Sequence, residues 1–316
     1  MSSMLEMEAY MQKFPLGDEP NYLAYRYPHA KDKLVKFEEK THTYFINYEN
    51  ETKDPCFSST GIVSVSQLVH RYFSKFDADE VIRKMRSRPS WNRNNKYFGM
   101  TNDEIKSGWS KSGEIASARG TWLHGQLERY WNGADLANTK YHDLTPIRQF
   151  FNWKSAVCDG VLQPLRTELR LVTDESLKVV GTADFIAIPT DHPDPVDCGG
   201  ILSVYLIDWK FSKGINYTNP VKAKGNGVCS ELEDTNFYHY SLQQNIYKWI
   251  LENYYGSWVL PGNKVYTSLK VESMQLAVFH ENHGDSGMVV VLPDQSDIVA
   301  SIIEEQRNVN QINVGN

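Results

Sequence analysis

The chain has 316 residues, of which 41% are hydrophobic and 23% are charged, and its formal net charge is -6. These proportions are typical of a folded protein and exclude a disordered chain, a collagen and a coiled coil. No apolar run approaches the roughly 18 residues that a membrane span needs. The N-terminal sequence MSSMLEMEAYMQKF lacks a secretory signal and is too acidic for a typical transit peptide. We therefore expect a soluble, intracellular protein of undetermined compartment that does not bind membranes.

The cysteines and the net charge narrow the candidate functions further. The chain has no C-x-x-C pair, which disfavours zinc and iron–sulfur sites and indicates reduced thiols at Cys56, Cys158, Cys198 and Cys229. A negative net charge is unusual for a protein that contacts phosphates. This objection to a nucleic-acid partner is weak, because a site that holds divalent cations is itself rich in carboxylates.

Short elements are predicted for the N-terminal part, which extends to about residue 100. They are a strand and two helices, at Thr43–Tyr48, Val65–Phe73 and Ala78–Met85. Thr101 and Glu104 then fit a capping box, which predicts a long helix from there to about residue 131. Another helix is predicted over residues 145–160, with Pro146 in its first turn.

From residue 167 the hydrophobic pattern has a period of two, as in strands. Three strands are predicted, the first two forming a hairpin, at Thr167–Val172, Val179–Ile188 and Ile201–Phe211. A loose segment then leads to a helix at Phe237–Tyr255. The remaining elements are a C-terminal helix from about residue 296 and, before it, three strands at Val265–Leu269, Met274–Phe279 and Met288–Leu292. The central order is therefore helix, three strands, helix and strand.

The third of these strands carries the strongest local signal. Alternate side chains of a strand share a face, so Asp208 and Lys210 point the same way while Trp209 faces the opposite side, toward the core. Taken alone, this pattern favours a solvated charge pair. Antiparallel pairing with the preceding strand, however, can place Asp184 beside Asp208. Two adjacent carboxylates need a counter-charge, which Mg²⁺ or Mn²⁺ supplies through oxygen ligands.

Two further side chains are candidate metal ligands. Glu168, on the first of the three strands, can add an oxygen, although it can equally face solvent. His124 lies on the long helix one turn before Glu128 and can bind a second ion through an imidazole nitrogen. A lone helical histidine is more often a structural hydrogen-bonding group. The small residues that weaken the helix around it nevertheless suggest close approach of a ligand or a backbone, at Gly120, Thr121 and Gly125.

Hydrolysis of a phosphodiester requires an activated water and a neutralised phosphate, both of which a metal provides. Lys210 suits the remaining task, because its compact ammonium can stabilise the attacking hydroxide and contact a phosphate oxygen. Gln243 and Tyr247, four residues apart on one helical face, can hydrogen bond the phosphate or a metal-bound water. The alternative for this last pair is the polar edge of an amphipathic helix.

Together these motifs resemble the RecB-like branch of the PD-(D/E)XK nuclease superfamily, which includes the mitochondrial genome maintenance exonuclease. The similarity spans roughly residues 119–247. It consists of G-T-x-x-H ending at His124, G-T-x-D ending at Asp184, D-x-K from Asp208 to Lys210, and Q-x-x-x-Y from Gln243 to Tyr247. Each motif is weak alone, but their order and their placement on helix, strand, strand and helix make coincidence improbable.

The resemblance implies a fold and a site. The fold is α/β, with a central mixed β-sheet flanked by helices in the order αβββαβ over residues 101–316, and with a helical N-terminal elaboration over residues 1–100. The implied catalytic machinery is a site for one or two Mg²⁺ or Mn²⁺ ions with ligands at His124, Asp184, Asp208 and the backbone carbonyl of Trp209, a catalytic lysine at Lys210, and contacts to the scissile strand at Gln243 and Tyr247.

The chain also departs from the family. Asp208 stands where the RecB-like branch commonly has glutamate. The interval between the two aspartates, 208 minus 184, is 24 residues and is longer than in compact members, so residues 190–200 look like an insertion. Relatives of the exonuclease-five type carry an iron–sulfur cluster, but the cysteine spacing that holds it is missing here. We therefore expect no such cluster.

Residues 82–98 contain six cations and no acid, interleaved with aromatic residues. This pattern suits single-stranded DNA, whose bases stack on aromatic rings at roughly 1–3 kcal/mol each. A solvated helix and loop is an equally good interpretation. The predicted contacts are Arg83, Lys84, Arg86, Arg88, Trp91, Arg93 and Lys96, with Lys213 in the loop after the third strand.

The sequence therefore predicts a metal-dependent deoxyribonuclease. We expect an exonuclease that prefers single-stranded DNA or frayed ends and that acts alongside replication or repair proteins. The alternatives are a structure-specific endonuclease, a catalytically silent DNA-binding or assembly module, and a hydrolase of small phosphoesters. The intact acids and lysine argue against the silent module, because binding alone does not require them.

Overall fold

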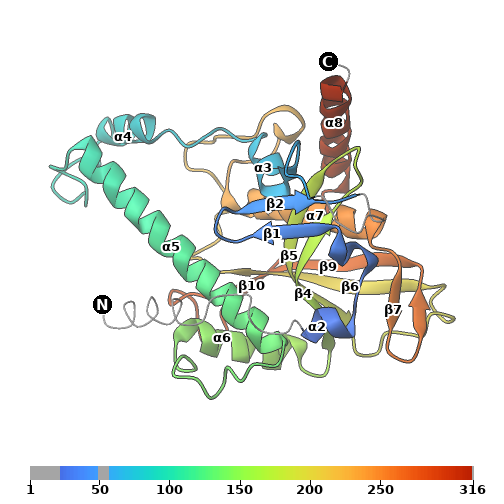
Figure 1. Ribbon diagram of the computed structural model, residues 1–316. Helices are drawn as coiled ribbons and strands as arrows, with labels where there is room; N and C mark the ends of the chain where they lie inside the picture. The colour runs from blue at the N-terminus through green and yellow to red at the C-terminus, as the bar shows by residue number, and fades with distance from the viewer. Residues whose placement is uncertain (1–21, 49–56, 315–316) are drawn as a thin grey trace.

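The computed structural model describes residues 22–48 and 57–314 of the chain. In it, a curled sheet of mixed strand direction is flanked by helices (Figure 1). No helix within these two ranges is long and apolar enough to cross a membrane. The predicted α/β class with a central mixed sheet is thus confirmed.

The described helices and strands include most of the predicted elements and several that were not predicted. The helices and short helical turns are α2 (Tyr22–Arg26), η1 (Ala30–Lys33), α3 (Val65–His70), α4 (Ala78–Arg86), α5 (Asn102–Trp131), α6 (Thr145–Trp153), η2 (Lys154–Cys158), η3 (Gly227–Cys229), α7 (Asn236–Tyr254) and α8 (Ser296–Val314). The strands are β1 (Val35–Glu38), β2 (Thr43–Ile46), β3 (Val63–Ser64), β4 (Leu162–Val172), β5 (Val179–Pro189), β6 (Ile201–Lys210), β7 (Trp258–Leu260), β8 (Lys264–Tyr266), β9 (Ser268–Val278) and β10 (Met288–Val291).

The six-stranded sheet has the order β10-β9-β6-β5-β3, and β4 also pairs with β5. β5 is antiparallel to both β4 and β6. β6 and β9 run parallel, because α7 and the β7–β8 hairpin carry the chain back between them. The predicted order of helix, three strands, helix and strand is therefore present as α6, β4, β5, β6, α7 and β9, with one hairpin inserted.

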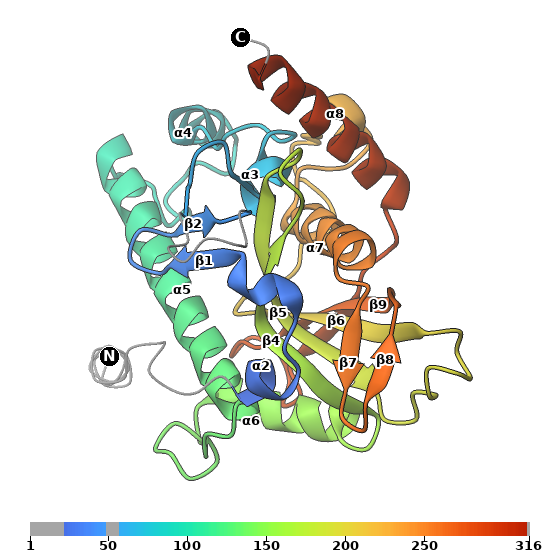
Figure 2. The ribbon, with the colours of Figure 1, turned by 45° about the vertical axis from the view of Figure 1, so that its right-hand side comes forward.

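Two cores hold helices against the sheet. One joins it to α3, α7 and α8. The other joins it to α5 and α6 and is built largely of aromatic rings, among them Phe185 and Trp209. Accordingly, α7 and α8 lie on one side and α5 and α6 on the other (Figure 2). Because Trp209 faces the aromatic core, the alternate residues Asp208 and Lys210 face α7.

The N-terminal part contributes to the sheet as well as covering it. The β1–β2 hairpin packs through Val35 and Ile46 against Val172 and Val180 of the sheet. β3 lies parallel to the beginning of β5. The chain then turns directly into α3. A capping box closes the first turn of this helix: the side chain of Ser64 accepts a hydrogen bond from the backbone N–H of Gln67, and the side chain of Gln67 accepts one from the backbone N–H of Ser64.

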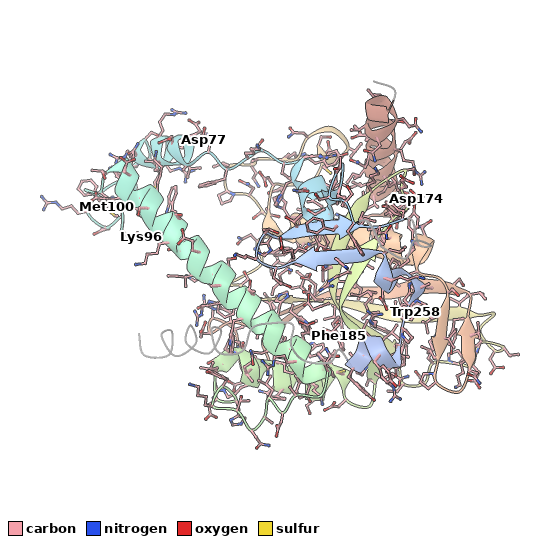
Figure 3. All side chains as sticks on the ribbon, viewed as in Figure 1. Asp77, Lys96, Met100, Asp174, Phe185 and Trp258 are labelled. Atoms are coloured by element: carbon pink, nitrogen blue, oxygen red, sulfur yellow. The ribbon has the colours of Figure 1, made fainter. Side chains whose placement is uncertain are left out.

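An arm formed by α4 and the outer half of α5 projects from the body of the protein (Figure 1). Figure 3 shows Lys96 and Met100 at its outer end, away from Phe185 in the sheet, and Asp77 at the beginning of α4, nearer the body. The predicted capping box of Thr101 begins α5. Residues 106–118 of this helix are mostly exposed, and burial against the aromatic core begins only at about residue 122.

Three predicted elements, two strands and one helix, differ from the observed ones. The separate strands at 265–269 and 274–279 are wrong, because Lys264–Tyr266 pairs with β7 in its own hairpin while β9 runs unbroken over Ser268–Val278. Exposed Lys270 and Glu272 alternate with buried residues, so they continue the strand rather than end it. The helix predicted for 145–160 ends as an α-helix at Trp153 and continues as the π turn η2.

The cysteines are free thiols at Cys158, Cys198 and Cys229. The prediction of reduced cysteines is confirmed for these three. Cys56 lies outside the described residues.

Candidate metal centre

The sheet opens along one edge of β5. This edge pairs with β3 up to Val180 and with β6 from Phe185 onward. Over residues 181–184 it therefore has no strand partner within the described part of the chain. The register between β5 and β6, extended by one residue, sets Asp184 opposite Asp208. The two aspartates of the motifs thus face each other where the strands begin to separate.

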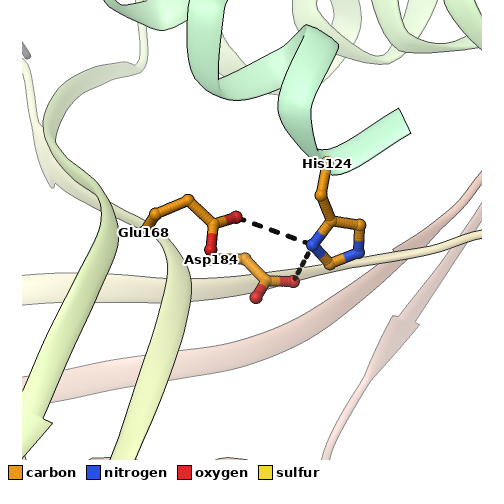
Figure 4. Close-up of side chains that lie close together, drawn as sticks. All are labelled: His124, Glu168 and Asp184. Carbon is orange, nitrogen blue, oxygen red and sulfur yellow. Dashed lines mark ion pairs between the residues drawn. The ribbon is translucent and has the colours of Figure 1, made fainter. Parts of the chain in front are cut away.

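Three side chains from three elements converge at this opening. His124 of α5, Glu168 of β4 and Asp184 of β5 each offer one ligand atom, and these atoms lie within 4.8 Å of one another. His124 Nδ1 is 3.6 Å from Glu168 Oε1 and 3.5 Å from Asp184 Oδ2 (Figure 4). A group of this composition could hold a metal ion, and all three residues were predicted as ligands.

The electrostatics of the group favour a cation. Burial alone would lower the pKa of His124, but the carboxylates of Asp184 and Glu168 outweigh burial and raise it to about 9. Burial raises the pKa of Asp184, although the charge of His124 opposes this effect. The two carboxylates therefore attract positive charge, which a divalent ion supplies more strongly than an imidazolium.

Glu168 has two features that fit a ligand. Its φ of +46° lies in the left-handed region, which non-glycine residues rarely adopt, within an otherwise extended strand. Its Oε1 is buried and accepts no hydrogen bond of normal length among the described residues, with His124 Nδ1 at 3.6 Å as its charged neighbour. Such an oxygen is costly unless a cation or a water satisfies it. Two carboxylates and an imidazole form a donor set compatible with Mn²⁺ and Mg²⁺, so the residues present fit a divalent cation.

Asp208 and Lys210 form a buried ion pair on the α7 side of the opening. Lys210 Nζ contacts Asp208 Oδ2, and Gln244 Nε2 donates to Asp208 Oδ1 at 2.7 Å. The ammonium also lies 4.8 Å from the ring centroid of Tyr240. Burial opposes the charge of Lys210, but Asp208 and Asp184 outweigh it and hold the pKa of Lys210 above its ordinary value. Asp208 is not in the three-residue ligand group, so its metal-binding role stays a prediction.

The backbone of Trp209 connects the carboxylates to the helix. The indole is fully buried in the aromatic core, as predicted. The N–H of Trp209 donates to Asp184 Oδ2 at 2.9 Å, and its carbonyl oxygen lies 2.9 Å from His124 Nε2. This carbonyl, predicted as a metal ligand, therefore lies at the edge of the group.

Gln243 and Tyr247 of α7 contact each other. Gln243 Nε2 donates to Tyr247 Oη at 3.1 Å and to Ser66 Oγ at 3.3 Å. Tyr247 is only 3% exposed, and its ring lies against Gly181.

Gln244, next to Gln243, was not predicted from the sequence, although it is the glutamine that contacts the D-x-K motif. Its position next to the Q-x-x-x-Y motif was the only signal for it.

A cleft of about 370 Å³ opens beside the three ligands, and its lining includes both His124 and Glu128, as their helical spacing predicted. Burial, with a further contribution from Glu168, raises the pKa of Glu128 to about 7. A Cβ on Gly120 would meet no atom within 4 Å. This glycine therefore leaves room in the cleft and does not accommodate a neighbouring backbone.

Tyr44 of β2 is a second residue that the sequence did not single out. It lines the cleft, and its hydroxyl is 2.8 Å from Thr182 Oγ1 on β5. The hairpin that carries it is far from the four motifs in sequence. No pattern in the motifs themselves could have indicated it.

The basic and aromatic segment lies on the arm, apart from this centre. Along α5, His124 is about 30 Å from the first turn, at 1.5 Å per residue. Several of the predicted nucleic-acid contacts have local partners: Arg83 and Lys84 pair with Glu80, Arg86 donates to the Met100 carbonyl and lies over Trp91, and Lys96 lies over Tyr97. Arg88, Arg93 and Lys213 are exposed.

The sequence matches no protein-family model and no curated protein. Membership of the nuclease superfamily therefore stays a prediction, supported by the motifs and by their location. Helix α5, strands β4, β5 and β6, and helix α7 bring all four motifs and Glu168 to one opening in the sheet, while the basic segment of the arm lies elsewhere.

Proposed function

We propose that this protein is a metal-dependent deoxyribonuclease with a restriction-endonuclease-like αβββαβ core. The observation that carries the proposal is the convergence of His124, Glu168 and Asp184 beside the buried Asp208–Lys210 pair. A carboxylate oxygen whose charged neighbour is an imidazole nitrogen at 3.6 Å, a left-handed backbone and a buried lysine lie together at one opening. These features are typical of a site that binds charged ligands.

In the proposed centre, Asp184, Glu168 and His124 hold a Mg²⁺ or Mn²⁺ ion. When bound, such an ion neutralises phosphate charge and makes water a better nucleophile. Trp209 orients Asp184 through its backbone N–H. Asp208 and Gln244 fix the direction of Lys210 through the ion pair and the hydrogen bond to the same carboxylate.

Lys210 supplies a permanent positive charge to the reacting atoms. Its side chain is 16% exposed, so the lysine is largely withdrawn from water. In this low-dielectric position the charge stabilises a phosphate oxygen or an attacking hydroxide more strongly than it would in bulk solvent. Asp208 prevents the lysine from losing its proton, because it holds the Lys210 pKa high.

We propose DNA with free or frayed single-stranded ends as the substrate. The arm supports this choice, because its exposed Arg88 and Arg93 flank Trp91 in the sequence, and aromatic residues can stack on bases. A structure-specific endonuclease that uses the same centre is the nearest alternative, and replication or repair proteins are the expected partners.

The test is a cleavage assay with single-stranded, duplex and circular DNA, labelled at either end, in Mg²⁺, Mn²⁺ or a chelator. We expect cutting of single-stranded ends that the chelator abolishes. Asp184→Asn and Glu168→Gln should each reduce the rate by about 100-fold or more. The matched controls Asp143→Asn and Glu175→Gln change exposed carboxylates and should keep the cleavage rate of the wild type. Efficient cutting of circles would favour the endonuclease, and equal activity of Asp184→Asn and wild type would refute the proposal.

A further inference from the structure

A second compartment adjoins the cleft that holds the metal ligands. It has a volume of about 510 Å³, within the roughly 300–1,000 Å³ typical of ligand sites. Its lining residues come from the β1–β2 hairpin, the segment around β3, the first turn of α3, β5 and α7. They are Phe37, His42, Thr43, Tyr44, Ser59, Ile62, Ser64, Val65, Ser66, Gln67, Gly181 and Tyr247.

The two compartments are contiguous. Phe37, His42 and Tyr44 line both of them. On β5, the consecutive residues Gly181 and Thr182 line the second and the first compartment respectively. The hydrogen bond between the hydroxyls of Tyr44 and Thr182 therefore marks the boundary between two adjacent spaces. A ligand that occupies both spaces has to cross this boundary at Tyr44.

The chemistry of the linings differs on the two sides of Tyr44. The metal cleft carries three glutamates, at Glu39, Glu128 and Glu168, and one arginine, at Arg170, so its charged lining is negative overall and attracts cations. None of the described residues that line the second compartment is Asp, Glu, Lys or Arg. Its walls offer hydroxyl and amide groups together with aromatic rings. Such walls suit a neutral, planar group with polar edges.

The aromatic rings are held in fixed positions. The Phe37 ring centroid is 4.5 Å from that of Tyr44 and 5.8 Å from that of His42. On the opposite wall, Tyr247 is held by the hydrogen bond from Gln243, and Gly181 leaves the space that its ring occupies. Rings fixed in this way bind a flat ligand at a small entropic cost.

We infer that this second compartment binds one nucleoside of a single strand, the one next to the phosphate at the metal centre. Its base stacks on the aromatic walls while hydroxyl and amide groups contact the base edge or the sugar. Because stacking is tolerant of sequence, the compartment recognises that a base is present and unpaired rather than which base it is. This inference rests on the proposed nuclease function and adds to it a requirement for an unpaired base.

The experiment measures binding and cleavage separately. A short 3′-fluorescein-labelled oligodeoxynucleotide is prepared intact and with a single tetrahydrofuran abasic residue at each position in turn. Its affinity for the full chain is measured by fluorescence anisotropy in a chelator, so that nothing is cut. The same series is then digested in Mn²⁺. The variants are Ser59→Trp and Thr43→Phe, which fill the compartment, and Thr60→Trp, a neighbouring control outside its lining.

We expect one abasic position to weaken binding by about 10-fold, within the range that stacking of one base contributes. Ser59→Trp and Thr43→Phe should weaken binding of the intact strand to a similar extent and remove the effect of that abasic position. Thr60→Trp should behave as wild type. Equal affinity for every abasic strand, or an unchanged profile in both filling variants, overturns the inference. A position-dependent loss of binding without any cleavage supports the compartment while refuting the hydrolysis.

Discussion

The ring of Tyr247 occupies the space that a side chain on Gly181 would need. A Cβ built on this glycine would overlap the ring carbon Cε1 and lie 3.1 Å from the tyrosine hydroxyl oxygen. The glycine of the G-T-x-D motif and the tyrosine of the Q-x-x-x-Y motif are therefore complementary in shape, although 66 residues, 247 minus 181, separate them in sequence. Two motifs that look independent form one packing unit.

Gly181→Ala should displace Tyr247 and loosen α7 against β5. Overpacking of this kind costs about 1–3 kcal/mol, so the free energy of unfolding in urea should fall by that amount. In a Tyr247→Ala background the same substitution should cost much less, because the clash is gone. Equal costs in both backgrounds would show that the two residues are not coupled.

Mn²⁺ binding should depend on Glu168 as strongly as on Asp184. Titration calorimetry of the full chain should show one or two sites in the wild type, and Glu168→Gln should weaken the tighter site by about 10-fold or more, because one anionic ligand is lost. Glu175→Gln serves as the control. Full retention of affinity in Glu168→Gln would remove this residue from the ligand set.

Lys210→Met should destabilise the protein more than the double variant Lys210→Met, Asp208→Asn does. The single change leaves the carboxylate of Asp208, which is 2% exposed, without its counter-charge. Removal of one partner of a buried pair costs about 3–5 kcal/mol. Lys210→Met combined with Asp208→Asn should recover part of that loss in urea unfolding, yet remain inactive on DNA. A fully active double variant would refute the role of Lys210.

His29 should make the protein acid-sensitive. Burial lowers the pKa of His29 to about 4, and its ring stacks on Tyr255 at a centroid distance of 4.6 Å. Because the unfolded chain binds the proton more tightly, the stability from the neutral ring is present above pH 6.5 and is lost as the pH falls toward 4. The difference in unfolding free energy between wild type and His29→Asn should therefore shrink by up to about 3 kcal/mol between pH 7 and pH 4. An equal difference at both pH values contradicts the buried neutral histidine.

Periodicity and capping patterns were sufficient for the strands β4, β5 and β6 and for the helices α5 and α7, but not for β3 or for the full length of β9. The Asp208–Lys210 alternation correctly predicted a shared face, because a strand allows only two directions for a side chain. The same reasoning placed Trp209 in the core. These predictions required only local geometry and the assumption that apolar faces are buried.

The residues that were missed depend on tertiary contacts. Gln243 and Gln244 are adjacent and chemically identical, and only the rotation of α7 against the sheet determines which one reaches Asp208. Tyr44 enters the cleft from a hairpin whose second strand was predicted, whereas its first strand, with alternating apolar and polar residues at Val35–Glu38, was not. A few neighbouring residues determine neither how a helix is rotated against a sheet nor where a hairpin packs.

The inner and outer halves of helix α5 are stabilised in different ways, although its backbone is continuous. Its inner turns are fixed by the aromatic core, whereas its outer turns contain four serines and two glycines between residues 107 and 117 and depend mostly on local hydrogen bonds. Amide protons of the outer turns should therefore exchange with solvent through fraying, and those around His124 only through opening of the core. We therefore expect the outer half of α5 to melt while the half that carries His124 stays folded.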